Sequence, residues 1–244
     1  MLRTGILRKL RIYKKVNWYK TIYFNFKMFP FVEAIKFPVF FYGRYKFSDL
    51  MGTVKINGPI KTAMIGFGQP YELQKQGMGI SELNLKGQLV FSGHVQFGKD
   101  CFVSISEGAY CEMGHMASLG SKSTLICTHK ISFGTWTRIG ADSKVIDTNY
   151  HQMYDAVTNE RFPIHGPIKL GNYNYIGSDV SIKQHTVTPD FCTIASYSLC
   201  NNDYSTYGKN ILIGGIPAKL LKNNISRDWE GERSRLEKTL IVEL

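Results

Sequence analysis

The middle of this 244-residue chain repeats with a period of six residues. Small or apolar residues recur six positions apart in four runs, with a phase slip or an interruption between them: Leu85, Phe91, Phe97, Val103 and Ala109; Met113, Leu119, Leu125 and Ile131; Phe133, Ile139 and Val145; Leu170, Ile176, Ile182, Thr188, Ile194 and Cys200. A period of six fits neither the 3.6 of a helix nor the simple alternation of a strand. It is typical of a chain that makes a short strand and a corner every six residues, so that three strands close a triangular coil and stacked coils pair as parallel strands. The sequence therefore predicts an all-β solenoid with the repeating residue inside the prism.

Three passages accompany the repeat. They are IDTNYH (146–151), PIKLGNYNYIGSDVSI (167–182) and IGGIPAKLLK (213–222). In this order they resemble the hexapeptide-repeat acyltransferases, and most of all the bacterial sugar and capsular-polysaccharide O-acetyltransferases. The resemblance covers about residues 50–225 and implies a left-handed parallel β-helix that forms trimers, a hand that the period alone does not fix. The chain departs from the family at Asn149, where an acid is common, and at Tyr175, where Trp is usual.

Residues 147–167 break the rhythm between two regular coils, and a loop of this length inside a solenoid is more often functional than accidental. The resemblance implies that the loop carries the catalytic histidine, His151, to a neighbouring subunit. Histidine suits the removal of a proton from a hydroxyl because its pKa lies near neutrality. Asp147 is the leading partner to orient the imidazole and Glu160 the second, although a carboxylate from another coil remains an alternative.

The other five histidines are weaker candidates. His165, at the end of the loop, contacts substrate or simply turns the chain. The rest sit inside regular coils, where surface or packing roles are expected: His94, His115, His129 and His185. They contain no close pair of the kind that a three-histidine zinc site needs, so we expect no metal.

The resemblance also implies acetyl-CoA as the acyl donor and a sugar or oligosaccharide hydroxyl as the acceptor. It places the Ser178 amide at the thioester as an oxyanion donor. The residues that it assigns to the pantetheine arm are Ser178, Ser196, Asn201 and Asn202. Lys219 and Lys222 are expected at the phosphates of CoA. The alternatives are another small hydroxyl or amino acceptor, or a β-helix that acts only as a scaffold or binding module.

The net charge of +11 is concentrated at the start of the chain. Residues 1–46 hold 11 of the 30 basic residues and a single acid, Glu33, so they alone carry +10. Ile6, Leu10, Tyr13 and Val16 follow helical spacing among these charges, and aromatic residues follow them. The segment is expected either to lie on an anionic membrane surface or to pack on the first coils with a solvated basic face. No nucleic-acid-binding module accompanies the charge, so nucleic acid is not an expected partner.

The remaining features complete the expected organisation. The five cysteines lack metal or redox spacing and are expected to be free, buried thiols of a reducing compartment. No secretory signal or bilayer-spanning stretch is apparent, so a cytoplasmic protein is expected, with peripheral attachment at the inner membrane as the further alternative. Residues 1–49 form a basic aromatic segment, 50–225 the β-helix with its loop, and 226–244 a C-terminal helix expected to cap the open end of the prism.

Overall fold

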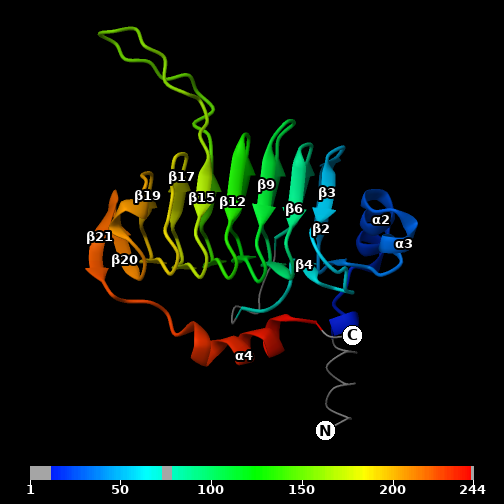
Figure 1. The fold of residues 1–244 in the computed structure, drawn as a ribbon. Coiled ribbons are helices and arrows are strands. Elements are labelled where there is room, and N and C mark those ends of the chain that lie inside the picture. Colours follow the sequence, from blue (N-terminus) through cyan, green and yellow to red (C-terminus); the bar gives the residue numbers. More distant parts are fainter. Residues whose placement is uncertain (1–11, 73–78, 243–244) are drawn as a thin grey trace.

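The computed structural model describes residues 12–72 and 79–242. The chain winds as a left-handed coil into a triangular prism whose three sides are sheets of stacked parallel strands (Figure 1). The prediction of a left-handed parallel β-helix is confirmed. Within the described ranges, no helix is both long and apolar enough to cross a bilayer.

The first five coils, from β1 to β15, each contribute one strand to each of three sheets, and the later coils add strands only to two of them. The nine-stranded sheet contains, in spatial order, β1 (Val39–Phe41), β4 (Ile65–Phe67), β7 (Val95–Phe97), β10 (Ser118–Leu119), β13 (Arg138–Ile139), β16 (Tyr175–Ile176), β18 (Thr193–Ile194), β20 (Ile211–Gly215) and β21 (Ala218–Asn223). The seven-stranded sheet contains β19 (Leu199–Cys200), β17 (Ser181–Lys183), β14 (Lys144–Ile146), β11 (Thr124–Cys127), β8 (Phe102–Ile105), β5 (Ser81–Leu85) and β2 (Tyr45–Leu50). The five-stranded sheet contains β15 (Ile168–Leu170), β12 (Lys130–Phe133), β9 (Tyr110–Met113), β6 (Gln88–Phe91) and β3 (Thr53–Ile56). We call the edges of the prism the 9/7, 7/5 and 5/9 edges after the sheets that meet there.

The phase slips of the six-residue rhythm arise from longer strands. Strands β8 and β9, which belong to one coil, each have four residues and send two side chains inward. Val103 and Ile105 are both buried, as are Cys111 and Met113. Two inward positions in one strand lengthen the coil beyond three hexapeptides, so the repeat restarts at Met113. All five cysteines are free and buried, as expected.

The 5/9 edge carries a column of large side chains on left-handed backbone. Met116, Trp136, Tyr173 and Phe191 occupy equivalent corners of successive coils, with φ between 55° and 60°. The Tyr173 and Phe191 rings stack at 4.9 Å. These four residues form a column that needs a cover, because corner side chains point away from the core of the prism.

Helix α4 (Trp229–Leu240) provides that cover, and the expectation that it caps the open end of the prism is wrong. The helix runs back along the side of the prism (Figure 1). The Trp229 ring lies 6.0 Å from Trp136, and the amide of Gln69 donates to the Leu240 carbonyl at 2.9 Å. The apolar residues of α4 thus pack against the column of corner residues. The open end of the nine-stranded sheet is formed instead by the antiparallel β20–β21 hairpin.

At the other end of the prism lie α2 (Trp18–Met28) and α3 (Phe31–Ala34). Strands β1 and β2 begin before residue 50 and already pair with β4 and β5, so the β-helix extends into the basic N-terminal segment. The expected helix around Ile6 and Leu10 lies outside the described residues. The short helix η1 (Ser205–Tyr207) follows the last strand of the seven-stranded sheet.

Candidate active site

Residues 147–167 form a long hairpin that leaves the 7/5 edge between β14 and β15 and projects away from the prism (Figure 1). Its two arms are joined by bridges between Thr148 and His165 and between Tyr154 and Arg161. At the tip, the Asp155 carboxylate accepts the backbone N–H groups of Val157 and Thr158 at 2.7 and 2.8 Å. These hydrogen bonds lower the pKa of Asp155, the Thr158 contribution being the largest. The loop is therefore an ordered arm.

The outward side chains of this arm are unusually apolar for a projecting loop. They comprise Tyr150, Met153, Tyr154, Val157, Phe162 and Ile164, and Val157 is 90% exposed. Across the described part of the chain, these side chains remain exposed and are not covered by an apolar surface. An exposed apolar set of this size marks a contact surface.

His151 lies on the first arm of the hairpin with an exposed side chain. Its imidazole makes no hydrogen bond or ion pair to any described residue of the chain. The preceding residue, Tyr150, has a φ of 60°, and its N–H donates to the Thr148 hydroxyl at 3.0 Å. This kink sets the direction in which His151 leaves the strand.

Asp147 does not reach His151. The carboxylate is fully buried at the root of the loop and accepts four hydrogen bonds from the preceding coil. Its Oδ1 accepts the Thr128 N–H at 2.7 Å and the Thr128 hydroxyl at 2.9 Å, and its Oδ2 accepts the N–H groups of His129 and Lys130 at 2.9 and 3.0 Å. Glu160 is exposed near the tip, and the part of the chain that is described offers His151 no carboxylate partner.

The second cluster of expected site residues lies on another edge of the prism. Ser178 and Ser196 occupy equivalent corners of adjacent coils on the 9/7 edge, after β16 and β18. The Ser178 N–H donates to the Ser196 Oγ at 3.2 Å. The expected free amide at Ser178 is therefore occupied, while the Ser196 hydroxyl keeps its own proton available to a ligand.

The β20–β21 hairpin extends this corner by one further layer. The Gly215 N–H donates to the Ser198 Oγ at 3.1 Å, which fixes the turn against the last corner. Lys219 is exposed opposite Gly214, close to this turn. Lys222 is exposed opposite Leu212, three residues away and so roughly 10 Å further along the strand.

Asn201 and Asn202 are separated from this cluster. They follow β19 and therefore lie on the 7/5 edge, the edge from which the loop also leaves. The Asn201 N–H donates to the Tyr204 hydroxyl, and the Asn202 carbonyl accepts the Val187 N–H. The structure thus brings Ser178 and Ser196 together, carries Lys219 on the hairpin that follows them in the stack, and places Asn201 and Asn202 on another edge.

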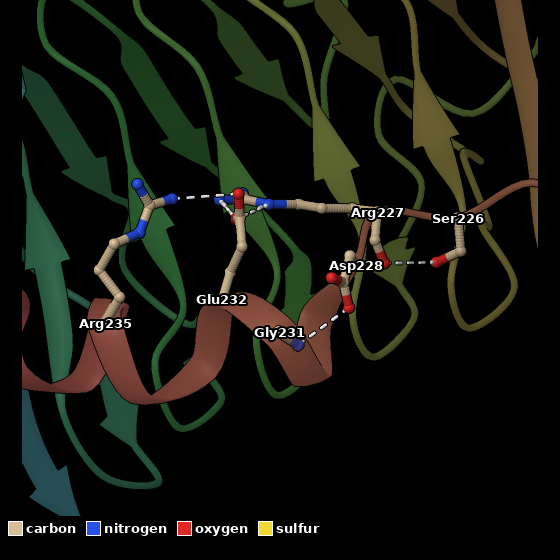
Figure 2. A network of polar contacts seen from close by, with 6 residues as sticks. All are labelled: Ser226, Arg227, Asp228, Gly231, Glu232 and Arg235. Carbon is tan, nitrogen blue, oxygen red and sulfur yellow. Dashed lines mark hydrogen bonds and ion pairs between the residues drawn. The ribbon is translucent and has the colours of Figure 1, made fainter.

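A pocket between the nine-stranded sheet and the start of helix α4 was not anticipated from the sequence. It has a volume of about 400 Å³ and is lined by Tyr175, Thr193, Ile225, Ser226, Arg227 and Glu232. The Arg227 guanidinium lies 5.0 Å from the Tyr175 ring and 4.8 Å from the Trp229 ring, and it forms an ion pair with Glu232. Arg235 binds the other oxygen of Glu232 at 3.1 Å (Figure 2). Only the departure from Trp at position 175 hinted at this pocket.

Four of the other five histidines form two pairs, and His185 belongs to neither. The His129 and His165 rings stack at 4.9 Å at the root of the loop, and the His94 and His115 rings lie 5.8 Å apart near the 5/9 edge. Burial, followed by the charges of His115 and Lys61, lowers the pKa of His94 to about 4. Across the described ranges, no group of three or more His, Cys, Asp or Glu side chains is arranged to hold a metal ion.

No protein-family model matches the sequence. A protein of Klebsiella pneumoniae, described as an uncharacterized 24.8 kDa protein in cps region, is 29% identical over 151 residues. The match covers 62% of this chain and 64% of that protein, so less than two thirds of the relative's length is spanned.

Three solved structures of low sequence identity are similar to parts of this chain. The polySia specific acetyltransferase NeuO is 16% identical, with 75% of this chain and 88% of that chain covered and a TM-score of 0.44. A single-residue mutant of AntD, an N-acyltransferase from Bacillus cereus in complex with dTDP-4-amino-4,6-dideoxyglucose and coenzyme A, is 12% identical, with coverages of 82% and 88% and a TM-score of 0.45. The polysialic acid O-acetyltransferase OatWY is 17% identical, with coverages of 76% and 91% and a TM-score of 0.35.

Proposed function

We propose that this protein is an acetyl-CoA-dependent O-acetyltransferase that acts on a hydroxyl of a sugar or polysaccharide, with His151 as the general base. One observation carries the proposal: an ordered arm holds His151, which has no hydrogen-bond partner among the described residues, away from its own prism, while the serine corner and the lysines of the hairpin lie on a different edge. The His151 arm and the 9/7 corner are the two halves of a site, and one chain does not bring them together.

The two halves meet in a trimer, in which the arm of one subunit reaches the 9/7 edge of the next. A head-to-tail contact of this kind closes into a ring. The apolar side chains along the arm would be buried in that contact, which supplies the cover that a single chain lacks. The carboxylate that orients His151 then comes from the neighbouring subunit.

In the proposed reaction, His151 removes the proton from the acceptor hydroxyl as its oxygen attacks the thioester carbonyl of acetyl-CoA. The C–S bond of the resulting tetrahedral intermediate breaks, and the imidazolium returns the proton to the departing thiolate. The Ser196 hydroxyl, which accepts the Ser178 N–H, donates its own proton to a hydrogen bond with the developing oxyanion. Lys219 and Lys222 supply positive charge along the β20–β21 hairpin for the phosphates of CoA.

The test of the shared site is complementation between two inactive chains. His151→Ala removes the base, and Ser196→Trp blocks the exposed corner without touching the core. Each variant alone should be inactive, but co-expression should restore up to about a quarter of wild-type activity, because random mixing pairs an intact arm with an intact corner at that frequency. Activity is read as CoA release against a panel of sugar and oligosaccharide acceptors. A mixture that stays inactive while both chains assemble would contradict the shared site.

Thermal unfolding separates the enzyme from a plain scaffold. A ligand that binds only the folded state raises the unfolding temperature, so acetyl-CoA at many times its Kd should stabilise the wild-type protein. The Ser196→Trp variant should show no such shift, whereas His151→Ala should keep it. Absence of any shift for the wild-type protein would favour a β-helix without an acyl donor site.

A further inference from the structure

Helix α2 reverses the usual distribution of polar and apolar residues. Its buried face carries Thr21 and Asn25 beside Phe24. The Asn25 amide donates to the Val39 carbonyl at 2.7 Å and its Oδ1 accepts the Val39 N–H at 3.2 Å, while the Thr21 hydroxyl accepts the Phe41 N–H at 3.1 Å. Polar side chains on this face satisfy the outer edge of β1, which is otherwise an unpaired sheet edge.

The opposite face of α2 is a stripe of exposed apolar side chains. Tyr19, Ile22, Tyr23 and Phe26 follow the spacing i, i+3, i+4, i+7, so they lie along one side of the helix. All four are exposed, with Tyr19 at 75%. A surface helix of a globular protein normally points such a stripe at the core and its polar residues at water.

Helix α3 and the residue after it enlarge the stripe into a patch. Phe31 and Val32 are 70% and 68% exposed, and Ile35 is also exposed. The Phe26 and Phe31 rings lie 6.0 Å apart, which makes the two surfaces continuous. We call the seven residues the end patch, because the two helices lie at the N-terminal end of the prism (Figure 1): Tyr19, Ile22, Tyr23, Phe26, Phe31, Val32 and Ile35.

The charges around the end patch are predominantly positive. Residues 12–46 contain seven basic residues and one acid, Glu33. Lys27 on α2 and Lys36 after α3 are exposed beside the patch, and residues 1–11 add four more basic residues to the same end of the sequence. An apolar patch bordered by lysines is complementary to a partner that has negative charges at its surface and an apolar layer directly beneath them.

We propose that the end patch docks this protein on an anionic lipid bilayer. Aromatic side chains favour the membrane–water boundary, and each lysine near an anionic leaflet adds attraction. A second copy of the chain fits less well, because two end patches placed face to face would bring like charges together. The membrane accounts for both the outward stripe and the excess of lysine.

The docked orientation determines how far the candidate active site lies from the membrane surface. The conclusion about the acceptor rests on the proposed function. Five strand spacings separate β1 from β16 in the nine-stranded sheet, or roughly 24 Å at the usual spacing. With the end patch on the membrane and the prism upright, the Ser178 corner stands about that far above β1. The acceptor that fits this geometry is a saccharide chain extending from a lipid anchor.

The test is co-sedimentation of the full chain with vesicles of phosphatidylcholine containing about 30% phosphatidylglycerol, and with pure phosphatidylcholine, at low and high salt. Wild-type protein should bind the anionic vesicles at low salt and lose most binding at high salt. The double variants Phe31→Ser/Val32→Ser and Lys27→Glu/Lys36→Glu should each lower the partition coefficient by about tenfold or more. Unfolding temperatures should stay at the wild-type value, since these side chains are exposed.

Matched controls lie at the other end of the prism and on its sides. Ile216→Ser/Leu221→Ser removes two apolar side chains that are comparably exposed, and Lys122→Glu/Lys144→Glu reverses two exposed lysines. Both controls should bind anionic vesicles as the wild type does. Equal binding by the end-patch variants, no preference for anionic vesicles, or lipid-independent end-to-end pairing in light scattering that the patch variants abolish would each overturn the proposal.

The proposal is separable from the proposed reaction. The His151→Ala variant should bind anionic vesicles normally, and Phe31→Ser/Val32→Ser should transfer acetyl to a soluble saccharide at the wild-type rate. Wild-type protein that binds anionic vesicles but transfers no acetyl group would count against the reaction alone, and wild-type protein that transfers acetyl but does not bind the vesicles would count against the membrane surface alone.

Discussion

The buried carboxylate of Asp147 accepts the backbone N–H of Thr128 at 2.7 Å across adjacent coils of the 7/5 edge. With three further hydrogen bonds from residues 128–130, this contact secures the corner immediately before the loop begins. The aspartate of the IDTNYH motif therefore anchors the arm. The position of His151 depends on it, although the two side chains do not touch.

Replacing Asp147 should affect stability. Asp147→Ala leaves three N–H groups and one hydroxyl without their acceptor, so the free energy of unfolding should fall by about 3 kcal/mol or more. Asp147→Asn keeps one oxygen acceptor and should cost less. Chemical denaturation measures both, with the exposed Glu160→Ala as the control that should match the wild type. An Asp147→Ala variant of normal stability and slow turnover would instead indicate a role in orienting His151.

His151→Ala should behave in the opposite way. The side chain is exposed and makes no hydrogen bond to any described residue, so its removal should leave the unfolding temperature unchanged. Loss of a general base should lower kcat for acetyl transfer by about 10²-fold or more. His165→Ala is the matched control on the second arm. Near-normal turnover by His151→Ala would remove it from the site.

Ser196→Ala tests whether the Ser196 hydroxyl stabilises the oxyanion of the tetrahedral intermediate. If the Ser196 hydroxyl donates to the intermediate, kcat should fall by about tenfold or more with little change in the KM for acetyl-CoA. Ser178→Ala keeps the backbone N–H and should leave kcat unchanged. A rise in kcat for Ser196→Ala would show that the freed Ser178 amide is the better donor.

Lys219→Glu and Lys222→Glu should each raise the KM for acetyl-CoA with a weaker effect on kcat, as expected when a remote phosphate contact is felt equally in the ground and transition states. Added salt should reduce the difference in KM between each variant and the wild type, because exposed charges are screened. Lys144→Glu, on the outer face of another sheet, is the control. Unchanged KM values in both hairpin variants would exclude the hairpin from nucleotide binding.

The sequence predicted the β-helix because inward residues must recur at the spacing of the corners, and Leu119, Leu125 and Ile131 do so without exception. The path of α4 could not be predicted in the same way. Its target is a column of corner residues such as Trp136 and Tyr173, which lie 37 positions apart and meet only after the coils stack. Corner residues of a β-helix are expected at its surface. A Trp at a corner therefore does not indicate which element will pack against it.

The candidate site was predictable to the extent that its parts are local. The loop and its histidine follow from the interruption of the rhythm, and the paired corners of Ser178 and Ser196 follow from their equivalent places in successive coils. The hydrogen-bond partners of the site residues could not be predicted from the sequence. The spacing of Asp147 and His151 suggested a pair, but burial at the corner gives the carboxylate to the Thr128 turn. The sequence also did not predict that α2 buries polar residues and exposes apolar ones. Thr21 and Asn25 are residue types expected at the surface, and only the contact with the edge of β1 explains their burial.

His94 should make stability depend on pH in a defined window. The residue is only 7% exposed, and burial, then the charges of His115 and Lys61, lowers its pKa to about 4. Because the folded-state pKa lies below the unfolded value of about 6.5, the neutral form favours the folded state. This contribution is complete above about pH 6.5 and is lost as the pH falls towards 4, by up to about 3 kcal/mol. His115, whose pKa is also lowered chiefly by burial, acts in the same direction. Denaturation midpoints between about pH 4 and 7 should therefore fall less steeply for His94→Gln than for the wild type. Identical slopes for the two proteins would mean that His94 is solvated in solution and titrates as it does in the unfolded chain.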